Sequence, residues 1–321
     1  MAEATIGRIP ISAAHPVLDD GRVPAKSVPG GMLEVAATVF REGHDLIGVE
    51  AVLYDHKARE QQRVTLQAQE GDRWNGHLRA DKIGRWGFEI EGFADLYATW
   101  AHHAELKIAA GVDVELMLAE GAALLAEAAD DPARNQTERQ DLAAAAAVLA
   151  DVNTTAGDRL AAGLAEPVRI AVGRLPIKDL VTTSRRYPIN VERDAAGRGA
   201  WYEFFPRSEG ARQHPETGEW TSGNFRTAKH SLDRVAEMGF DVIYLPPIHP
   251  IGEVNRKGPN NSLVAGPADP GSPWAIGSAA GGHDAIHPDL GSFQDFDDFV
   301  ARAAELGLEV ALDLALQAAP D

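Results

Sequence analysis

Lys257 is the first residue whose type and setting predict chemistry. It lies in VIYLPPIHPIGEVNRKGPNN, residues 242–261, where an apolar run typical of a buried strand leads into a loop rich in Gly, Pro and Asn. Lysine is a compact point charge that suits a phosphate oxygen, and Gly258 and Pro259 can aim it without a helix. From the residues alone, Lys257 is either a contact for a small anion or a solvated surface lysine.

Asp313 and Gln317 are further candidates, in the last apolar run LEVALDLALQ. A carboxylate inside such a run is costly to bury unless it is hydrogen-bonded or paired. Asp313 is therefore predicted either to contact a ligand or to close a structural network with an arginine or a backbone amide. Gln317 lies at or just past the strand end, where its amide offers a donor and an acceptor to a hydroxylated ligand.

The sequence lacks the patterns of several other kinds of site. His283 and His287 in GGHDAIHPDLG have no neighbouring ligands at metal-binding spacing, so we interpret them as loop-packing or hydrogen-bonding groups and predict no metal site. Glycine-rich phosphate fingerprints and a nucleophile elbow are also absent. We therefore predict no cofactor.

The elements that must position these residues alternate between strand and helix. Strand candidates are AWYEFF, FDVIYLPP and LEVALDLAL, and helix candidates are TAKHSLDRVAEM, which Gly239 stops, and DFDDFVARAAEL, which Ser292 and Asp295 open. Such units indicate a parallel sheet with right-handed crossovers, and functional loops leave the carboxyl ends of its strands. The loop from about Pro246 to Leu290 far exceeds the usual connection of about two to six residues, so we predict that it is functional.

Residues 32–100 have a different pattern, with a period near two. Short alternating runs such as LEVAATVF, VEAVLYD and RWGFEIEGF are separated by Gly, Asp and Asn, which favours an antiparallel sandwich. Trp74, Trp86 and Phe88 are expected to be core residues, and stacking on sugar rings is the alternative.

Composition changes near His102, after which Ala, Leu and Glu dominate to about Ala171. LMLAEGAALLAEAA is helical by propensity, Thr137 to Gln140 predict a capping box before DLAAAAAVLADV, and GDRLAAGLA is a third helical piece. This helical segment is either a dimerisation surface or a lid over the sandwich. YPINVERD, after the helices, is expected to complete the sandwich.

The whole-chain composition excludes other classes of function. A net charge of −18, from 48 acidic and 30 basic residues, argues against a nucleic-acid partner, because such binding is mostly cation–phosphate attraction. The absence of cysteine is compatible with a reducing cytosol. The N-terminus MAEATIGRIPISAAHP has no signal-peptide pattern and no stretch reaches membrane-spanning length, so we expect a soluble, cytoplasmic protein without a membrane partner.

Long motifs give a resemblance that spans the chain. GAWYEFFPRSEG, LPPIHPIGEVNRKGPNN, SPWAIGSAAGGHDAIHPDLGSFQDFDDFV and LEVALDLALQAAPD together resemble the bacterial α-1,4-glucan:maltose-1-phosphate maltosyltransferases of the α-amylase superfamily, of glycoside hydrolase family 13 type. The resemblance implies a glycosyltransferase that moves maltose from maltose 1-phosphate to the non-reducing end of an α-1,4-glucan, with retention of configuration and release of phosphate.

The resemblance also implies an architecture of several domains and roles for single residues. The implied domains are an antiparallel β-sandwich over 1–102, completed by 181–193, an inserted α-helical domain over 103–180 used in homodimer formation, and the start of a (β/α)₈ barrel over 194–321. In the family the lysine of NRKGPNN and the glutamine of DLALQ help to bind the donor, which carries over to Lys257 and Gln317. Asn261 is a further candidate for substrate binding, and Asp313 is placed near the subsite of the cleaved sugar.

The resemblance leaves the catalytic carboxylates unassigned. A (β/α)₈ barrel takes about 250 residues and eight strands, and about three strands fit between Gly199 and Asp321. We therefore expect an N-terminal portion of the enzyme that is inactive alone, with the nucleophile and the acid/base beyond residue 321. Typical amylases have Asn-His where this chain has Gln317-Ala318. This difference weakens the interpretation of the protein as a simple hydrolase. The alternatives are a non-catalytic fragment for glucan binding or dimerisation, and a related hydrolase or isomerase.

Overall fold

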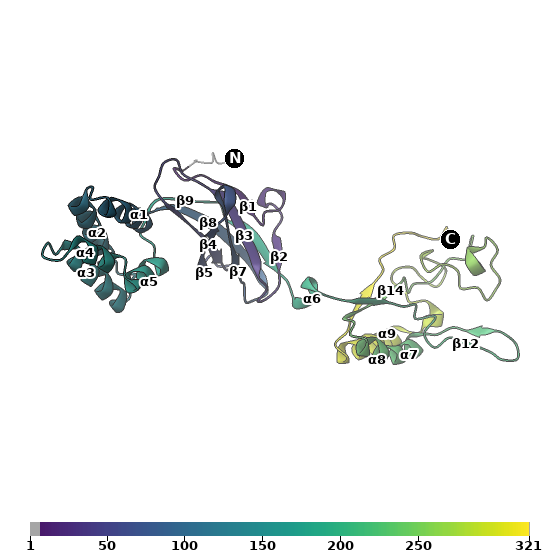
Figure 1. Ribbon diagram of the computed structural model, residues 1–321. Coiled ribbons are helices and arrows are strands. Elements are labelled where there is room, and N and C mark those ends of the chain that lie inside the picture. Colours follow the sequence, from purple (N-terminus) through teal and green to yellow (C-terminus); the bar gives the residue numbers. More distant parts are fainter. Residues whose placement is uncertain (1–6, 321) are drawn as a thin grey trace. The chain divides into compact units, whose positions relative to one another are not determined.

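The computed structural model describes residues 7–320, which form two compact units (Figure 1). The first unit extends to Asp194 and the second begins at Ala195. Buried apolar side chains make two clusters in the first unit and one in the second. Each unit thus has its own interior.

Two β-sheets form much of the first unit. One has the strand order β1-β3-β7-β6, and the other has the order β2-β10-β8-β4-β5 with β9 added against β8. All strand pairs are antiparallel except β2 with β10. The strands are β1 (Ile11–His15), β2 (Ala25–Ser27), β3 (Leu33–Val39), β4 (Ile47–Tyr54), β5 (Glu60–Thr65), β6 (Gln67–Ala68), β7 (Arg73–Leu78), β8 (Gly84–Asp95), β9 (Lys178–Thr183) and β10 (Tyr187–Val191).

Side chains of both sheets share one hydrophobic cluster. Phe88 is fully buried in it, and Trp74 and Trp86 pack against it partly buried. The two indole N–H groups donate to backbone carbonyls, of Val39 at 3.0 Å and of Lys82 at 2.9 Å. The prediction that these three aromatic residues belong to the core is confirmed.

The chain returns to the second sheet after the helices. β10, from the predicted segment YPINVERD, pairs with β8 from Tyr187–Phe88 to Val191–Gly84. β9 pairs with the same strand near its other end. The predicted strand character of this segment is confirmed. β8 thus pairs with β4, which precedes the helices in sequence, and with β9 and β10, which follow them.

The helices start directly after β8. The Asp95 carboxylate accepts a hydrogen bond from the Ala98 backbone N–H, so α1 begins at Leu96, before the composition change near His102. The last helix ends at Arg174, before the upper limit of 180 expected for the helical segment. The helices are α1 (Leu96–Ala109), α2 (Val114–Ala129), α3 (Gln136–Ala150), α4 (Ala156–Gly163) and α5 (Glu166–Arg174).

The predicted capping box at Thr137 is wrong. Asn135 is the N-cap of α3, because its side chain accepts from the Glu138 N–H while the Glu138 carboxylate accepts from the Asn135 N–H. This reciprocal pair satisfies two backbone donors and places the N-cap two residues before the predicted one.

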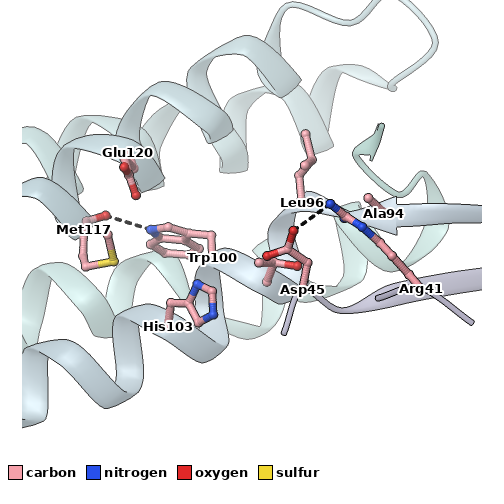
Figure 2. A pocket seen from close by; sticks show the side chains of 9 residues that line it. Arg41, Asp45, Ala94, Leu96, Trp100, His103, Met117 and Glu120 are labelled. Carbon is pink, nitrogen blue, oxygen red and sulfur yellow. Dashed lines mark hydrogen bonds and ion pairs between the residues drawn. The ribbon is translucent and has the colours of Figure 1, made fainter. Parts of the chain in front are cut away.

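Trp100 fixes the packing of α1 against α2. Its indole N–H donates to the Met117 carbonyl at 2.8 Å, and Figure 2 shows the ring beside His103 and Met117. A cavity of about 250 Å³ lies at this junction of helices and sheet, where the ion pair of Arg41 and Asp45 forms one side (Figure 2).

Substituting Gly121 by alanine is expected to destabilise the first unit. A Cβ at this helical position would lie 2.1 Å from Cζ2 of Trp100, so the buried indole would have to move. Such overpacking costs about 1–3 kcal/mol. Urea unfolding followed by circular dichroism measures the loss. Gly173→Ala in α5 is the matched control, because nothing lies within 4 Å of its Cβ position, and an unchanged midpoint for Gly121→Ala would contradict the packing argument.

The second unit is built on the parallel sheet β11-β14-β15. The expected helix TAKHSLDRVAEM is interrupted by the 3-10 turn η3, and the predicted Ser292–Asp295 capping box of α9 is confirmed. The short helix α6 (Asp194–Gly197) spans the boundary between the units in sequence. The second unit contains β11 (Trp201–Glu203), β12 (Arg212–Gln213), β13 (Trp220–Thr221), α7 (Phe225–Ala228), η3 (Lys229–Ser231), α8 (Leu232–Glu237), β14 (Val242–Leu245), α9 (Phe293–Glu305) and β15 (Glu309–Leu312). No helix within residues 7–320 is long and apolar enough to cross a membrane.

Candidate functional site

The long loop after β14 folds back on itself and is held by backbone hydrogen bonds. Ile251 and Ile276 form an antiparallel bridge, flanked by Gly252 N–H to the Ala275 carbonyl at 3.0 Å and Gly277 N–H to the Pro250 carbonyl at 2.9 Å. These bonds hold together the two ends of the loop segment that contains Lys257 and Asn261.

The same Ile276 ties this loop to the segment after β15. It forms a parallel bridge with Ala318, and the Ala319 N–H donates to its carbonyl at 2.8 Å. Gln317, which follows the third strand, is thereby held next to residues of the loop that follows the second strand.

A cavity of about 320 Å³ lies between these two segments. It brings together Lys257, Asn261 and Gln317, three of the residues predicted for substrate binding. Its lining consists of Ile251, Gly252, Asn255, Arg256, Lys257, Asn261, Ser272, Trp274, Ala275, Gln317 and Ala318. Among the described residues, the lining contains no carboxylate but includes Arg256 and Lys257, so these lining residues carry positive charge in a strongly acidic chain.

The backbone around Lys257 is fixed by its neighbours. The Arg256 guanidinium donates to the carbonyls of Gly252 at 3.0 Å and Ile251 at 3.1 Å, which closes the turn that precedes Lys257. On the other side Gly258 is required, because a Cβ there would lie 2.0 Å from the Val264 carbonyl oxygen. Lys257 is half-buried, and within residues 7–320 its ammonium has no hydrogen-bond or ion-pair partner.

Asp313 lies just outside this cavity and contacts one of its walls. It follows β15 instead of lying inside the strand, and it is only partly buried. The Trp274 indole N–H donates to its carboxylate at 2.8 Å. Burial and the hydrogen bond that Tyr244 makes to the same carboxylate raise the pKa of Tyr244. The prediction that an arginine pairs with Asp313 is therefore wrong. The neutral aromatic donors Trp274 and Tyr244 hydrogen-bond to its carboxylate instead.

Sequence reasoning missed Trp274 and Arg256. Trp274 both lines the cavity and orients Asp313, and its ring lies edge-on to Phe205 with centroids 6.1 Å apart. The tryptophan in the loop segment GSPWAIG was the feature of the sequence that could have identified Trp274 as a site residue. Arg256 was visible beside Lys257, but its role in closing the turn depends on carbonyls that only the folded loop presents.

The loop histidines have the hydrogen-bonding role predicted for them. His283 Nε2 donates to the Ala315 carbonyl at 2.6 Å, and His287 Nδ1 accepts from the Asp289 N–H at 3.1 Å. Burial and the nearby Arg207 cation lower the pKa of His287, which keeps the ring neutral and able to accept at pH 7. Among the described residues, no group of three or more His, Asp or Glu side chains is placed to hold a metal ion.

Comparison with known proteins identifies the family. A sequence profile described as "Alpha-1,4-glucan:maltose-1-phosphate maltosyltransferase, domain N/S" matches residues 7–193, more than half of the chain. The chain belongs to the α-1,4-glucan:maltose-1-phosphate maltosyltransferase family. Since the profile covers the first unit, similarity in the second unit rests on individual relatives.

Two curated maltosyltransferases match nearly the whole chain. Alpha-1,4-glucan:maltose-1-phosphate maltosyltransferase 1 of Streptomyces coelicolor is 50% identical over 98% of this chain and 46% of its own length. The maltosyltransferase of Mycobacterium tuberculosis is 44% identical over 98% of this chain and 48% of its own length. The chain therefore spans about half the length of the curated maltosyltransferases it matches. A crystal structure of an alpha-amylase from Lactobacillus plantarum is 35% identical over 36% of this chain and 22% of that chain, with a TM-score of 0.26.

Proposed function

We propose that this chain forms the donor-binding part of a cytoplasmic maltosyltransferase. The proposed reaction moves maltose from maltose 1-phosphate to the non-reducing end of an α-1,4-glucan with retention, in α-glucan synthesis. The observation that carries the proposal is the cavity that gathers Lys257, Asn261 and Gln317 in a chain of this family.

The chemistry of the cavity suits a phosphorylated sugar. The unpartnered Lys257 ammonium can pair with the phosphate, since charge-assisted hydrogen bonds to phosphate oxygens are among the strong ones. The amides of Asn261 and Gln317 offer both donors and acceptors to sugar hydroxyls. A volume of about 320 Å³ lies at the lower end of the range of small-molecule sites.

The proposed role of the cavity is donor binding. Retaining glycosyl transfer needs two carboxylates roughly 5 Å apart, one as nucleophile and one as acid/base. The part of the lining formed by residues 7–320 contains no Asp or Glu, and the nearby Asp313 carboxylate is held by Trp274. We therefore assign no catalytic residue to the cavity.

The finer domain organisation is part of the proposal. We infer a β-sandwich, expected over 1–102 and 181–193, an inserted helical segment, expected over 103–180 and formed by α1 to α5 between Leu96 and Arg174, and the first strands of a (β/α)₈ barrel over 194–321. Support comes from the single hydrophobic cluster that both sheets of the first unit share. The parallel strands β11, β14 and β15, with α7, α8 and α9 between them, are the repeating pattern of such a barrel.

The helical segment is proposed to form a homodimer. Leu106, Val112 and Leu116, near the turn between α1 and α2, are 59%, 50% and 53% exposed, and clustered exposed apolar side chains favour an interface. Light scattering of the purified chain is expected to give twice the mass of one chain, and Leu116→Glu is expected to give the monomer mass. A monomeric wild-type chain over the micromolar range would contradict this assignment.

The donor proposal is tested by calorimetric titration of the purified chain with maltose 1-phosphate, maltose and inorganic phosphate in parallel. Maltose 1-phosphate is expected to bind more tightly than either fragment, because only it engages the ammonium and the amides together. Equal affinity for maltose and maltose 1-phosphate would contradict the proposed contact between Lys257 and the phosphate. Release of phosphate from the donor by this chain would show that it contains catalytic carboxylates.

A further inference from the structure

Trp274 presents an apolar surface to the donor cavity, the cavity lined by Lys257 and Gln317. Among the described residues of this lining it is the only aromatic one, and its side chain is half-buried. An indole has one polar group, its Nε1–H, and in Trp274 this group donates to the Asp313 carboxylate at 2.8 Å. Because that donor is occupied, the indole offers carbon atoms to a ligand in the cavity.

Hydrogen bonds fix the backbone next to Trp274. The N–H of Ala275 donates to the Ser272 carbonyl at 3.0 Å, and the carbonyl of Ala275 accepts from the Gly252 N–H at 3.0 Å. These bonds set the point from which the Trp274 side chain starts. They do not set the direction of the indole, which depends on the groups that the ring itself contacts.

Asp313 is the polar group that fixes the direction of the indole. It directly follows β15, and its backbone N–H donates to the Leu245 carbonyl of β14 at 2.9 Å. The Tyr244 hydroxyl, also from β14, hydrogen-bonds to the Asp313 carboxylate. The carboxylate is thus held by two neighbouring strands, whereas Trp274 lies in a long loop. A group on a rigid sheet that bonds to a loop side chain holds that side chain in one orientation.

The lining of the donor cavity combines two kinds of chemistry. Lys257, Asn261 and Gln317 bring a cation and two amides. The apolar part of the lining consists of Ile251, Trp274, Ala275 and Ala318. A sugar ring has C–H groups on its faces and hydroxyl groups around its rim, so an indole suits a face and the amides suit the rim. A phosphate group has no apolar face, and the indole is therefore matched to the sugar part of a ligand.

We propose that Trp274 contacts the sugar of the donor and that Asp313 is a positioning residue, which holds the indole through its Nε1–H group. The inference rests on the proposed function, because the sugar is that of maltose 1-phosphate. Asp313 is not part of the described lining, and it acts through Trp274 instead of touching the ligand. This role differs from the one that the family resemblance implies, in which the aspartate itself lies near the cleaved sugar.

A double-mutant cycle tests the positioning role by calorimetric titration of the purified chain with maltose. Trp274→Phe removes the N–H donor and Asp313→Ala removes its acceptor, so each is expected to weaken maltose binding about fivefold. The double variant is expected to show the same loss of about fivefold, because both changes break one interaction. A multiplied loss of about twenty-five-fold would mean that Asp313 contacts the sugar directly, and it would overturn the positioning role.

Asp313→Asn is the conservative variant. Its amide oxygen still accepts from the indole, so maltose affinity should stay within about twofold of the wild type. Near-ultraviolet circular dichroism reports the indole itself, as the difference between the wild-type and Trp274→Phe spectra. This signal should be lost in Asp313→Ala and kept in Asp313→Asn. An unchanged indole signal in an Asp313→Ala variant that unfolds at the wild-type midpoint would overturn the positioning role.

Two further ligands separate this inference from the proposed function. Maltose 1-phosphate should lose the same factor as maltose in Trp274→Phe, whereas inorganic phosphate, which has no sugar ring, should bind as it does to the wild type. Weaker phosphate binding by Trp274→Phe would place the indole against the anion and overturn the sugar contact. Absence of maltose 1-phosphate binding by the wild type overturns the proposed function together with the sugar contact. Donor binding that is unchanged in both single variants overturns this inference alone.

Discussion

Lys257→Ala is expected to weaken maltose 1-phosphate binding by about ten- to a hundredfold. Lys257 is half-buried and lines the donor cavity, and its ammonium has no partner among the described residues, so a bound phosphate would be its counter-ion. A hydrogen bond to a charged group contributes about 1.5–3 kcal/mol, and each 1.4 kcal/mol changes affinity about tenfold. Calorimetric titration of wild type and variant with the donor measures the change.

The specificity of this loss distinguishes a phosphate contact from a general defect. Maltose affinity should be nearly unchanged in Lys257→Ala, because the sugar lacks the phosphate. Lys82→Ala is the matched control, since that lysine side chain is 81% exposed and lies in the first unit. A Lys257→Ala variant that binds maltose 1-phosphate as tightly as the wild type does would refute the assignment of the loop as a phosphate-binding element.

Glu50→Gln is expected to lower the unfolding free energy of the first unit by about 3 kcal/mol. Glu50 is 2% exposed and accepts hydrogen bonds from Arg63 at 2.8 Å and from Lys178 at 2.6 Å. Glu91 accepts from the same two cations, at 2.6 Å and 3.1 Å. Removing one buried carboxylate leaves two partly buried cations with less compensating charge, which costs more than loss of a surface pair.

Urea unfolding followed by circular dichroism tests this expectation. The transition to follow is the unfolding of the first unit, which Gly121→Ala is also expected to shift. Glu60→Gln provides the control, because Glu60 pairs with the same Arg63 through a side chain that is 44% exposed. Surface pairs of this kind contribute less than about 1 kcal/mol. Equal effects of the two substitutions would mean that burial of Glu50 adds nothing to the strength of the network.

The same network makes stability depend on pH in a defined direction. Burial alone would raise the pKa of Glu91, but hydrogen bonds from Arg63 and Lys178 outweigh burial and hold it below its ordinary value of 4.5. A carboxylate with a lower pKa in the folded chain stabilises the fold above its unfolded pKa. We therefore expect this contribution to disappear as the pH falls from about 4.5 through the folded pKa of Glu91.

Local patterns in the sequence determined many of the elements. The period of two over residues 32–100 predicted strands, and the helix over LMLAEGAALLAEAA and the Ser292 cap were read correctly. Each depends on interactions within a few residues, such as side-chain alternation or an N-cap hydrogen bond. The error at Thr137 had the same local origin, because Asn135 with Glu138 forms a competing capping box two residues earlier.

Lys257 and Gln317 were predicted from sequence as separate residues, and the tertiary structure decided that they line one cavity. Their proximity depends on Ile276, which bridges Ile251 on one side and Ala318 on the other. Asp313 was expected to need compensation, but its partners Trp274 and Tyr244 come from a distant loop and a neighbouring strand. The burial of Glu50 likewise requires cations from β5 and β9. Composition and spacing specify which groups can interact, whereas long-range backbone pairing specifies which ones meet.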